Sequence, residues 1–244
     1  MTRYLVTLEY KGTPFHGFQK QPGLPTVQGA LDRAILTYTG QEVRTLGAGR
    51  TDAGVHALGQ AAAFDLSEKV DIGKALRGLN ALLPRGISIT AIREVAPDFD
   101  PRRDAVSREY RYLVLNRPAP SPLLEDFAYH FPGELDIGSM KEACSFFEGE
   151  HDFSAFRVGS EEKPTVRKVL RCEIVEPLPG LFYFSVRAES FLYKMVRIMG
   201  GAVLSVGSGR MSLSALESHL GGGTGPCVEP LPAQGLFLWE IAYH

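Results

Sequence analysis

Residues 47–57 combine three glycines with one arginine, one carboxylate and one histidine. Glycines permit tight turns and the close approach of another molecule. Arg50 and Asp52 are two positions apart, so on an extended backbone their side chains project from the same face. A guanidinium lowers the pKa of a neighbouring carboxyl. An ionised Asp52 suits a nucleophile or an electrostatic anchor rather than a general acid, which needs a raised pKa. The alternative is that the segment is only a charged turn.

The whole chain has the composition of an ordinary globular protein. Its 244 residues, 44% apolar and 22% charged, allow one large domain or two small ones. The three cysteines have neither disulfide nor metal-ligand spacing, which favours a reducing, cytoplasmic location. The six histidines also lack metal spacing, so no metal site is expected. The sequence shows neither a signal peptide nor a membrane-spanning apolar run, and no membrane partner is expected.

Positive charge is concentrated locally although the net charge is −2. Residues 102–117 hold five arginines against Asp104 and Glu109. A second cluster consists of Lys163, Arg167, Lys168 and Arg171. Charge runs usually form solvated faces, but two such runs with aromatic residues among them favour a polyanionic partner.

The elements that must position these residues follow one order twice. The first hundred residues predict strand, helix, strand, strand, helix and strand, which is the ferredoxin-like order. The predicted elements there are residues 3–10, 27–38, 43–46, 59–66, 71–82 and 87–95. The second half resembles the same order with extra loops, including strands at 107–116, 165–175, 181–188 and 236–243. The fold expected is α+β with two lobes, residues 1–104 and 105–244.

Two further groups of side chains have two interpretations each. On the strand 107–116, Tyr110 shares a face with Arg108, either for cross-strand packing or as a stacking surface for a base. In the loop 11–23, Phe15 and Phe18 either contact a ligand or pin the loop to the core. A helix capped by Ser190 would carry an aromatic and basic row of Phe191, Lys194 and Arg197, unless that face is merely solvated.

At residues 49–56 the chain resembles the TruA family of tRNA pseudouridine synthases, whose hallmark is Gly-Arg-Thr-Asp-x-Gly-Val-His. Further stretches similar to this family occur in the expected order along the whole chain. They begin at Tyr10 (Tyr-Lys-Gly-Thr-Pro-Phe-His-Gly-Phe-Gln), Thr26 (Thr-Val-Gln), Ser107 (Ser-Arg-Glu-Tyr-Arg-Tyr), Asp152 (Asp-Phe-Ser-Ala-Phe), Phe191 (Phe-Leu-Tyr-Lys-Met-Val-Arg) and Pro232 (Pro-Ala-Gln-Gly-Leu).

The resemblance implies an enzyme that isomerises uridine to pseudouridine without a metal, nucleotide or redox cofactor. Asp52 corresponds to the family's catalytic aspartate, which forms a covalent adduct. Tyr110 corresponds to the tyrosine that stacks on the target base, and Arg197 to the arginine that pairs with the aspartate. Arg50 corresponds to the motif arginine near the flipped nucleotide.

The same resemblance extends to substrate and assembly. It implies tRNA as the substrate, at positions 38, 39 and 40 of the anticodon stem-loop, and a homodimer. It also implies two ferredoxin-like (RRM-like) lobes in one extended, mostly antiparallel sheet, with helices on one side and a catalytic cleft between the lobes.

Two rival functions are less favoured. A non-catalytic RNA-binding protein of the same fold would not require Asp52, Arg50, Tyr110 and Arg197 together. A glycoside hydrolase using Asp52 would normally need a second carboxylate, whereas the motif offers one carboxylate flanked by arginine. His56 is interpreted as a structural member of the loop rather than a general base.

Overall fold

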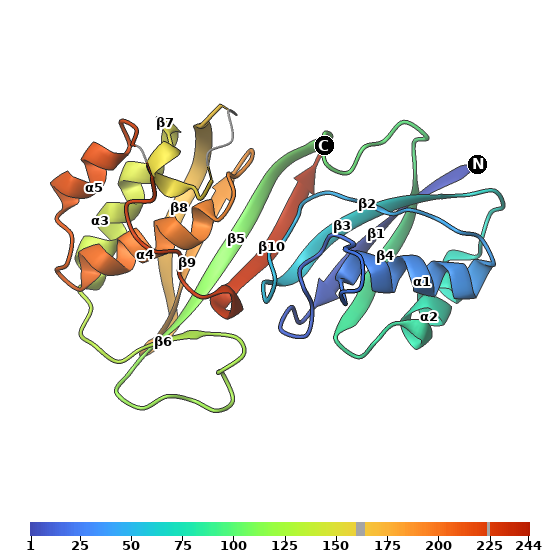
Figure 1. The fold of residues 1–244 in the computed structure, drawn as a ribbon, viewed down its shortest axis with the longest axis horizontal. Helices are drawn as coiled ribbons and strands as arrows, with labels where there is room; N and C mark the ends of the chain where they lie inside the picture. The colour runs from blue at the N-terminus through green and yellow to red at the C-terminus, as the bar shows by residue number, and fades with distance from the viewer. Residues whose placement is uncertain (160–163, 224) are drawn as a thin grey trace. The chain divides into compact units, whose positions relative to one another are not determined.

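The computed structural model describes residues 1–159, 164–223 and 225–244, which form two compact units of α+β structure (Figure 1). The first unit comprises residues 1–106 and 237–244, and the second comprises residues 107–236. The sequence places residues 236–243 in the second lobe, but the last strand pairs in parallel with a strand of the first unit, Phe237 opposite His56. The chain therefore passes from one unit to the other twice, within β5 and near the start of β10.

The first unit is a mostly antiparallel sheet with two helices. Its strands run in the order β4-β1-β3-β10, with β2 paired to β3. The element order matches the sequence-based prediction from β1 to β4. The bounds are β1 Thr2–Tyr10, α1 Val27–Thr39, β2 Leu46–Gly47, β3 His56–Leu66, α2 Ile72–Leu82, β4 Ile87–Val95 and β10 Leu236–Tyr243.

The short strand β2 begins later than the predicted strand at residues 43–46, because side chains of α1 form hydrogen bonds with the backbone of Thr45. Thr45 donates its backbone N–H to a carboxylate oxygen of Asp32 at 3.1 Å. The carbonyl oxygen of Thr45 accepts a hydrogen bond from the amide of Gln28 at 2.6 Å. These polar groups are satisfied by the helix, so they do not join the strand ladder.

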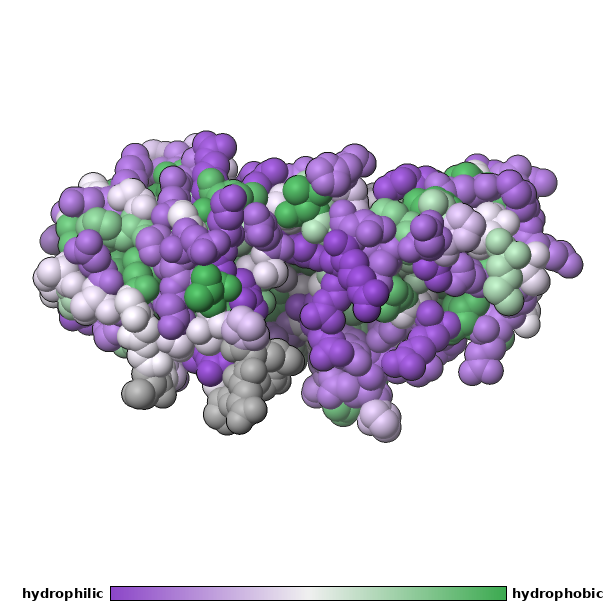
Figure 2. Space-filling view, turned by 90° about the horizontal axis from the view of Figure 1, so that it is seen from above, coloured by the Kyte–Doolittle hydropathy of each residue, from purple (hydrophilic) through white to green (hydrophobic). Residues whose placement is uncertain are grey.

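The core of the first unit lies between the sheet and its helices. Tyr4, Val6 and Leu8 alternate along β1 and are buried, as the period of a strand requires. They share the core with Leu31 and Ile35 of α1, which begins after the N-cap Thr26, as the sequence predicts. On the face of the molecule shown in Figure 2, apolar side chains stand among hydrophilic ones, as is usual for a globular surface.

The second unit has its own mostly antiparallel strands, in the order β5-β9-β8-β7, and β6 pairs with β5 in parallel. The helix α3 packs against α4 and against β8. No helix within the described residues has the length and hydropathy that a membrane crossing requires. The bounds are β5 Ala105–Asn116, β6 Tyr129–Phe131, α3 Ile137–Phe147, β7 Gly149–Asp152, η1 Ser154–Phe156, β8 Val166–Leu178, β9 Leu181–Ala188, α4 Met195–Gly207, α5 Leu213–His219 and η2 Ala233–Gly235.

The helix α4 differs from its prediction at its beginning. Its N-cap is Lys194, with φ of 60°, and not Ser190. A residue in this left-handed conformation cannot continue the helix backward, so residues 190–194 are irregular. Phe191 therefore lies outside the helix, and the predicted row of Phe191, Lys194 and Arg197 on one helix face does not exist.

Candidate active site

Asp52 opens a tight turn immediately before β3. Its carbonyl oxygen accepts the backbone N–H of Val55 at 3.2 Å. Gly54 has φ of 81° in this turn, a conformation that strongly favours glycine. The Asp52 side chain is half-buried and Arg50 is exposed. Residues 50–55 do not form a strand, so the alternation expected of an extended backbone does not relate Arg50 to Asp52.

The loop 11–23 packs directly on the Asp52 turn. Phe18 donates its backbone N–H to the carbonyl oxygen of Thr51 at 3.1 Å, and Gly54 donates to that of Phe15 at 3.4 Å. Gly17 has φ of 84°, and a Cβ atom added to it would lie 2.6 Å from the Thr51 carbonyl oxygen. Phe15 and Phe18 are buried, so their rings pin the loop to the core, which decides between the two interpretations offered by the sequence.

Buried polar side chains hold the two arms of the turn. The hydroxyl groups of Tyr10 and Thr51 lie 2.8 Å apart. Gln60 donates from its amide nitrogen to the carbonyl oxygen of Gly49 at 2.9 Å. Neither Tyr10 nor Gln60 is among the site residues predicted from the sequence. The signal for Gln60 is a polar residue next to the apolar run Ala61–Phe64 in the strand that follows the motif.

His56 is a buried structural residue in this loop. Its Nδ1 accepts the backbone N–H of Gly12 at 3.0 Å, and its ring stacks on Phe237 with centroids 4.7 Å apart. Because a backbone N–H can only donate, Nδ1 carries no proton in this arrangement and the imidazole is neutral. The contacts fit the structural interpretation of His56 and leave it poorly placed to exchange protons with solvent.

Side chains of α1 extend this support to the neighbouring loops. Gln28 accepts the backbone N–H of Lys20 at 2.8 Å and donates to the carbonyl oxygen of Thr45. Asp32 accepts the Thr45 hydroxyl at 2.8 Å. Both are buried polar residues one helical turn apart, on the face that a simple apolar stripe would fill. The sequence signal for their role is the presence of two polar residues where an amphipathic helix would carry apolar ones.

In the second unit, the two tyrosines of β5 have different environments. Tyr112 is fully buried, and its hydroxyl donates to the carbonyl oxygen of Pro232 at 2.8 Å. Tyr110 is half-buried and meets the ring of Phe191 edge to face, with centroids 5.1 Å apart. Packing therefore explains Tyr112, while Tyr110 is only partly buried.

Arg197 is held at the beginning of α4. Its Nε–H donates to the carbonyl oxygen of Leu231 at 2.6 Å. The residue is half-buried. Burial raises the pKa of the nearby Tyr112, and the positive charge of Arg197 opposes that shift. Asp52 and Arg50 thus belong to the first unit, and Tyr110 and Arg197 belong to the second.

Arginines of the basic clusters form hydrogen bonds within the second unit. The carboxylate of Glu109, 7% exposed, accepts hydrogen bonds from Arg111 at 2.8 Å and from Arg187 at 2.6 Å. Burial favours the neutral carboxyl, but the bonds from Arg187 and Arg111 outweigh it, and the pKa of Glu109 lies below its ordinary value. Arg167 donates to backbone carbonyl oxygens of Pro164 and Val166, and Lys163 lies outside the described residues.

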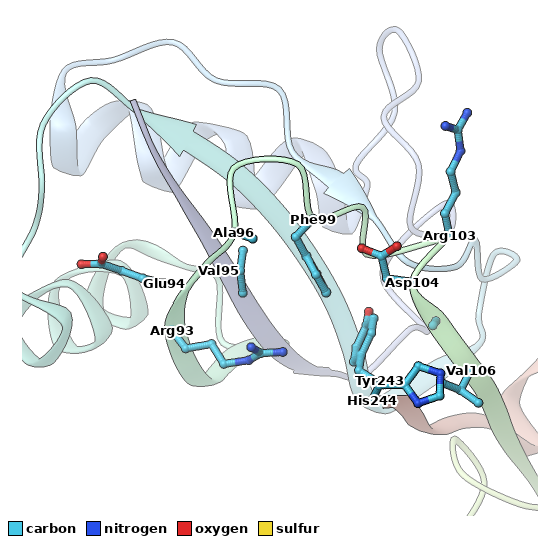
Figure 3. Close-up of a pocket in the computed structure, with 11 residues that line it drawn as sticks. Arg93, Glu94, Val95, Ala96, Phe99, Arg103, Asp104, Val106, Tyr243 and His244 are labelled. Atoms are coloured by element: carbon cyan, nitrogen blue, oxygen red, sulfur yellow. The ribbon is translucent and has the colours of Figure 1, made fainter.

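An open hollow of about 760 Å³ lies in the first unit, toward the ends of β4 and β10 (Figure 3). The rings of Phe99 and Tyr243 line it, with centroids 5.2 Å apart, and the Tyr243 hydroxyl donates to the carbonyl oxygen of Pro101 at 2.8 Å. None of the four predicted site residues lines this hollow. Among the described residues, no group of three or more histidine, cysteine or acidic side chains is placed to hold a metal ion.

Comparison with known proteins identifies the family. Residues 7–102 and 143–244 match the model of the tRNA pseudouridine synthase family. The tRNA pseudouridine synthase A of Caldicellulosiruptor saccharolyticus is 40% identical over the full length of both chains. That of Neisseria gonorrhoeae is 44% identical over 88% of this chain and 82% of its own length.

Among solved structures, an archaeal box H/ACA sRNP Nop10–Cbf5 complex aligns with 84% of this chain and 44% of the matched chain, at 17% identity and a TM-score of 0.41. The family match and the relatives at 40% and 44% identity carry the assignment. On their evidence the chain belongs to the TruA family of tRNA pseudouridine synthases, and its activity is that of a tRNA pseudouridine synthase, an isomerase.

Proposed function

We propose that this enzyme converts uridines 38, 39 and 40 of the tRNA anticodon stem-loop to pseudouridine, with Asp52 as the nucleophile. The observation that supports Asp52 is its place on a turn fixed by hydrogen bonds from Val55 and Phe18. A nucleophile needs a defined position relative to its substrate, because misplacement by about 1 Å costs about 10²-fold in rate. Asp52 is only half-buried, as a residue that must meet a substrate requires.

The reaction that we propose begins when the target uridine leaves its stack. Asp52 forms a covalent adduct and the N-glycosidic bond breaks. The uracil then turns over and rejoins the sugar through carbon, and the bond to Asp52 breaks so that the carboxylate is regenerated. The new carbon–carbon bond replaces the proton at that carbon, and the nitrogen released from the sugar gains a proton, so the product is an isomer of the substrate. Tyr110 would stack on the flipped base, supported by its edge-to-face contact with Phe191.

The arginines have electrostatic roles in this proposal. Arg197 would pair with the carboxylate of Asp52. The exposed Arg50 would contact the phosphate of the flipped nucleotide. We propose further that each unit is a ferredoxin-like lobe. The enzyme would be a cytoplasmic homodimer. The alternative function, a non-catalytic RNA-binding protein, is disfavoured because the chain belongs to a family of synthases.

The variant Asp52→Asn tests the nucleophile without changing side-chain size. Wild-type enzyme is incubated with unmodified tRNA, and pseudouridine is mapped at each position. We expect Asp52→Asn to form none while retaining the wild-type Kd for tRNA and the wild-type free energy of unfolding. Asp98→Asn, which makes the same change at an exposed position of the first unit, should behave as wild type. Pseudouridine formation by Asp52→Asn would refute the nucleophile, and wild-type products only outside positions 38–40 would refute the target.

A further inference from the structure

Three side chains form a buried hydrogen-bonded chain beneath the Asp52 turn. Tyr10 ends β1, Gln60 lies within β3, and Thr51 immediately precedes Asp52. They are 3%, 0% and 7% exposed. The Gln60 amide nitrogen lies 3.4 Å from the Tyr10 hydroxyl, which lies 2.8 Å from the Thr51 hydroxyl. Polar side chains at such positions are expensive to bury unless each is hydrogen-bonded.

The Gln60 amide has a set orientation in this chain. The oxygen of the Gln60 amide accepts the backbone N–H of Ala61 at 3.1 Å, which fixes the amide nitrogen on the opposite side. That nitrogen can only donate, so the Tyr10 oxygen accepts from it, while either hydroxyl group can donate in the bond between Tyr10 and Thr51. Burial raises the pKa of Tyr10 to about 12, so the phenol keeps its hydrogen at neutral pH.

The hydrogen-bonded chain connects the sheet to Gly49 and Thr51, the two residues on either side of the motif arginine Arg50. Gln60 also donates to the carbonyl oxygen of Gly49 at 2.9 Å, on the arm that leads into the turn. Thr51 is held by Tyr10 through its side chain and by Phe18 through its carbonyl oxygen. The backbone that carries Arg50 and Asp52 is thus held by side chains from two strands, β1 and β3.

We propose that Tyr10 and Gln60 are positioning residues that act through Thr51 and Gly49 to hold the Asp52 carboxylate in one place for the reaction. The inference rests on the proposed role of Asp52 as nucleophile. The sheet could be stable with apolar residues at these positions, since Val6 and Leu8 occupy equivalent places along β1. The hydrogen-bonded chain therefore serves the geometry of the turn beyond filling the core.

The test compares tyrosine hydroxyl groups at two places on one strand. Tyr10→Phe removes the hydroxyl that contacts Thr51. Tyr4→Phe is its matched control, because Tyr4 is buried on the same face of β1 and its hydroxyl accepts the backbone N–H of Val70 at 3.1 Å, away from the turn. We expect Tyr10→Phe to lower kcat about 10-fold or more with little change in KM or in the Kd for tRNA. Tyr4→Phe should lower the free energy of unfolding about as much as Tyr10→Phe does, and should leave kcat unchanged.

Thr51 provides an independent check by rescue. Thr51→Val keeps the shape of the side chain but lacks the hydroxyl, and should lower kcat as Tyr10→Phe does. Thr51→Ser keeps the hydroxyl and should recover most of that loss. The double variant Tyr10→Phe/Thr51→Val should lose no more than the more impaired single variant, because both changes remove the same hydrogen bond.

Two outcomes overturn the inference and are distinguishable. If Tyr10→Phe retains wild-type kcat, or loses no more than Tyr4→Phe, while Asp52→Asn is inactive, then Tyr10 does not position the nucleophile and the proposed function stands. If Asp52→Asn is active in the same assay, the nucleophile is another group, and both proposals fail.

Discussion

Arg197 and Leu231 form a reciprocal pair of hydrogen bonds in the second unit. The Nε–H of Arg197 donates to the Leu231 carbonyl oxygen at 2.6 Å, and the Leu231 N–H donates to the Arg197 carbonyl oxygen at 3.2 Å. The side chain is thereby fixed at its Nε edge, which orients the plane of the guanidinium. An arginine held in this way presents its outer nitrogens in a set direction.

Arg197→Lys tests whether that orientation matters beyond the positive charge. Lysine keeps the charge but cannot donate to Leu231 and present a planar fork at the same time. We expect kcat to fall at least about 10-fold. Arg210→Lys is the control, since Arg210 is exposed and its Nε donates to the Ser208 hydroxyl at 2.9 Å. Equal kcat in wild type and Arg197→Lys would show that Arg197 contributes only charge.

Tyr110→Ala tests the stacking residue. Removing the ring takes away the surface on which the flipped base would rest, and such stacking is worth about 1–3 kcal/mol per base. We expect a much larger loss in kcat than in tRNA affinity, because the ring would contact only one nucleotide of the tRNA. Tyr110→Phe keeps the ring and its contact with Phe191, and should retain most of the activity. Weakened binding with normal kcat would contradict the assignment.

Gly17→Ala tests the contact between the loop 11–23 and the Asp52 turn. Gly17 and Gly23 both have positive φ, 84° and 73°, so alanine strains either position by about 1–2 kcal/mol. A Cβ atom at Gly17 would also meet the Thr51 carbonyl oxygen at 2.6 Å, whereas no atom lies within 4 Å at Gly23. We expect both variants to lower the free energy of unfolding, measured in urea, and only Gly17→Ala to lower kcat. Unchanged kcat in Gly17→Ala would show that the turn tolerates displacement.

Glu109→Gln tests the buried ion-pair network of the second unit. The folded-state pKa of Glu109 is lowered, so its contribution is present above the unfolded pKa, about 4.3, and is lost as pH falls through the folded pKa. Glu109→Gln should lower the free energy of unfolding at pH 7 by about 1–3 kcal/mol and flatten its decline below pH 5. Glu173→Gln, at a more exposed pair with Arg171, should cost about 0–1 kcal/mol. Identical pH profiles of wild type and Glu109→Gln would contradict this account.

Elements with a clear period could be predicted from the sequence alone. The alternation in β1 and the capped, periodic helix α1 were predicted because each pattern reports which face is buried. The beginning of α4 was predicted wrongly, because nothing local marks Lys194 as a left-handed residue. The pairing of β10 with β3 joins residues about 180 positions apart, and local patterns do not report such contacts.

The motif around Asp52 and the ordered stretches along the chain indicate the family without any structure, because the reaction of that family depends on particular residue types. The residues that support the motif became visible only in the fold. In sequence, Gln28 and Gln60 stand out only as polar residues among apolar ones, and folding brings Gln60 to the Gly49 carbonyl oxygen, Gln28 to that of Thr45, and the Tyr10 hydroxyl to that of Thr51. The physical reason is that a residue type carries its own reactivity, whereas its position depends on hydrogen bonds between segments that meet only in the folded chain.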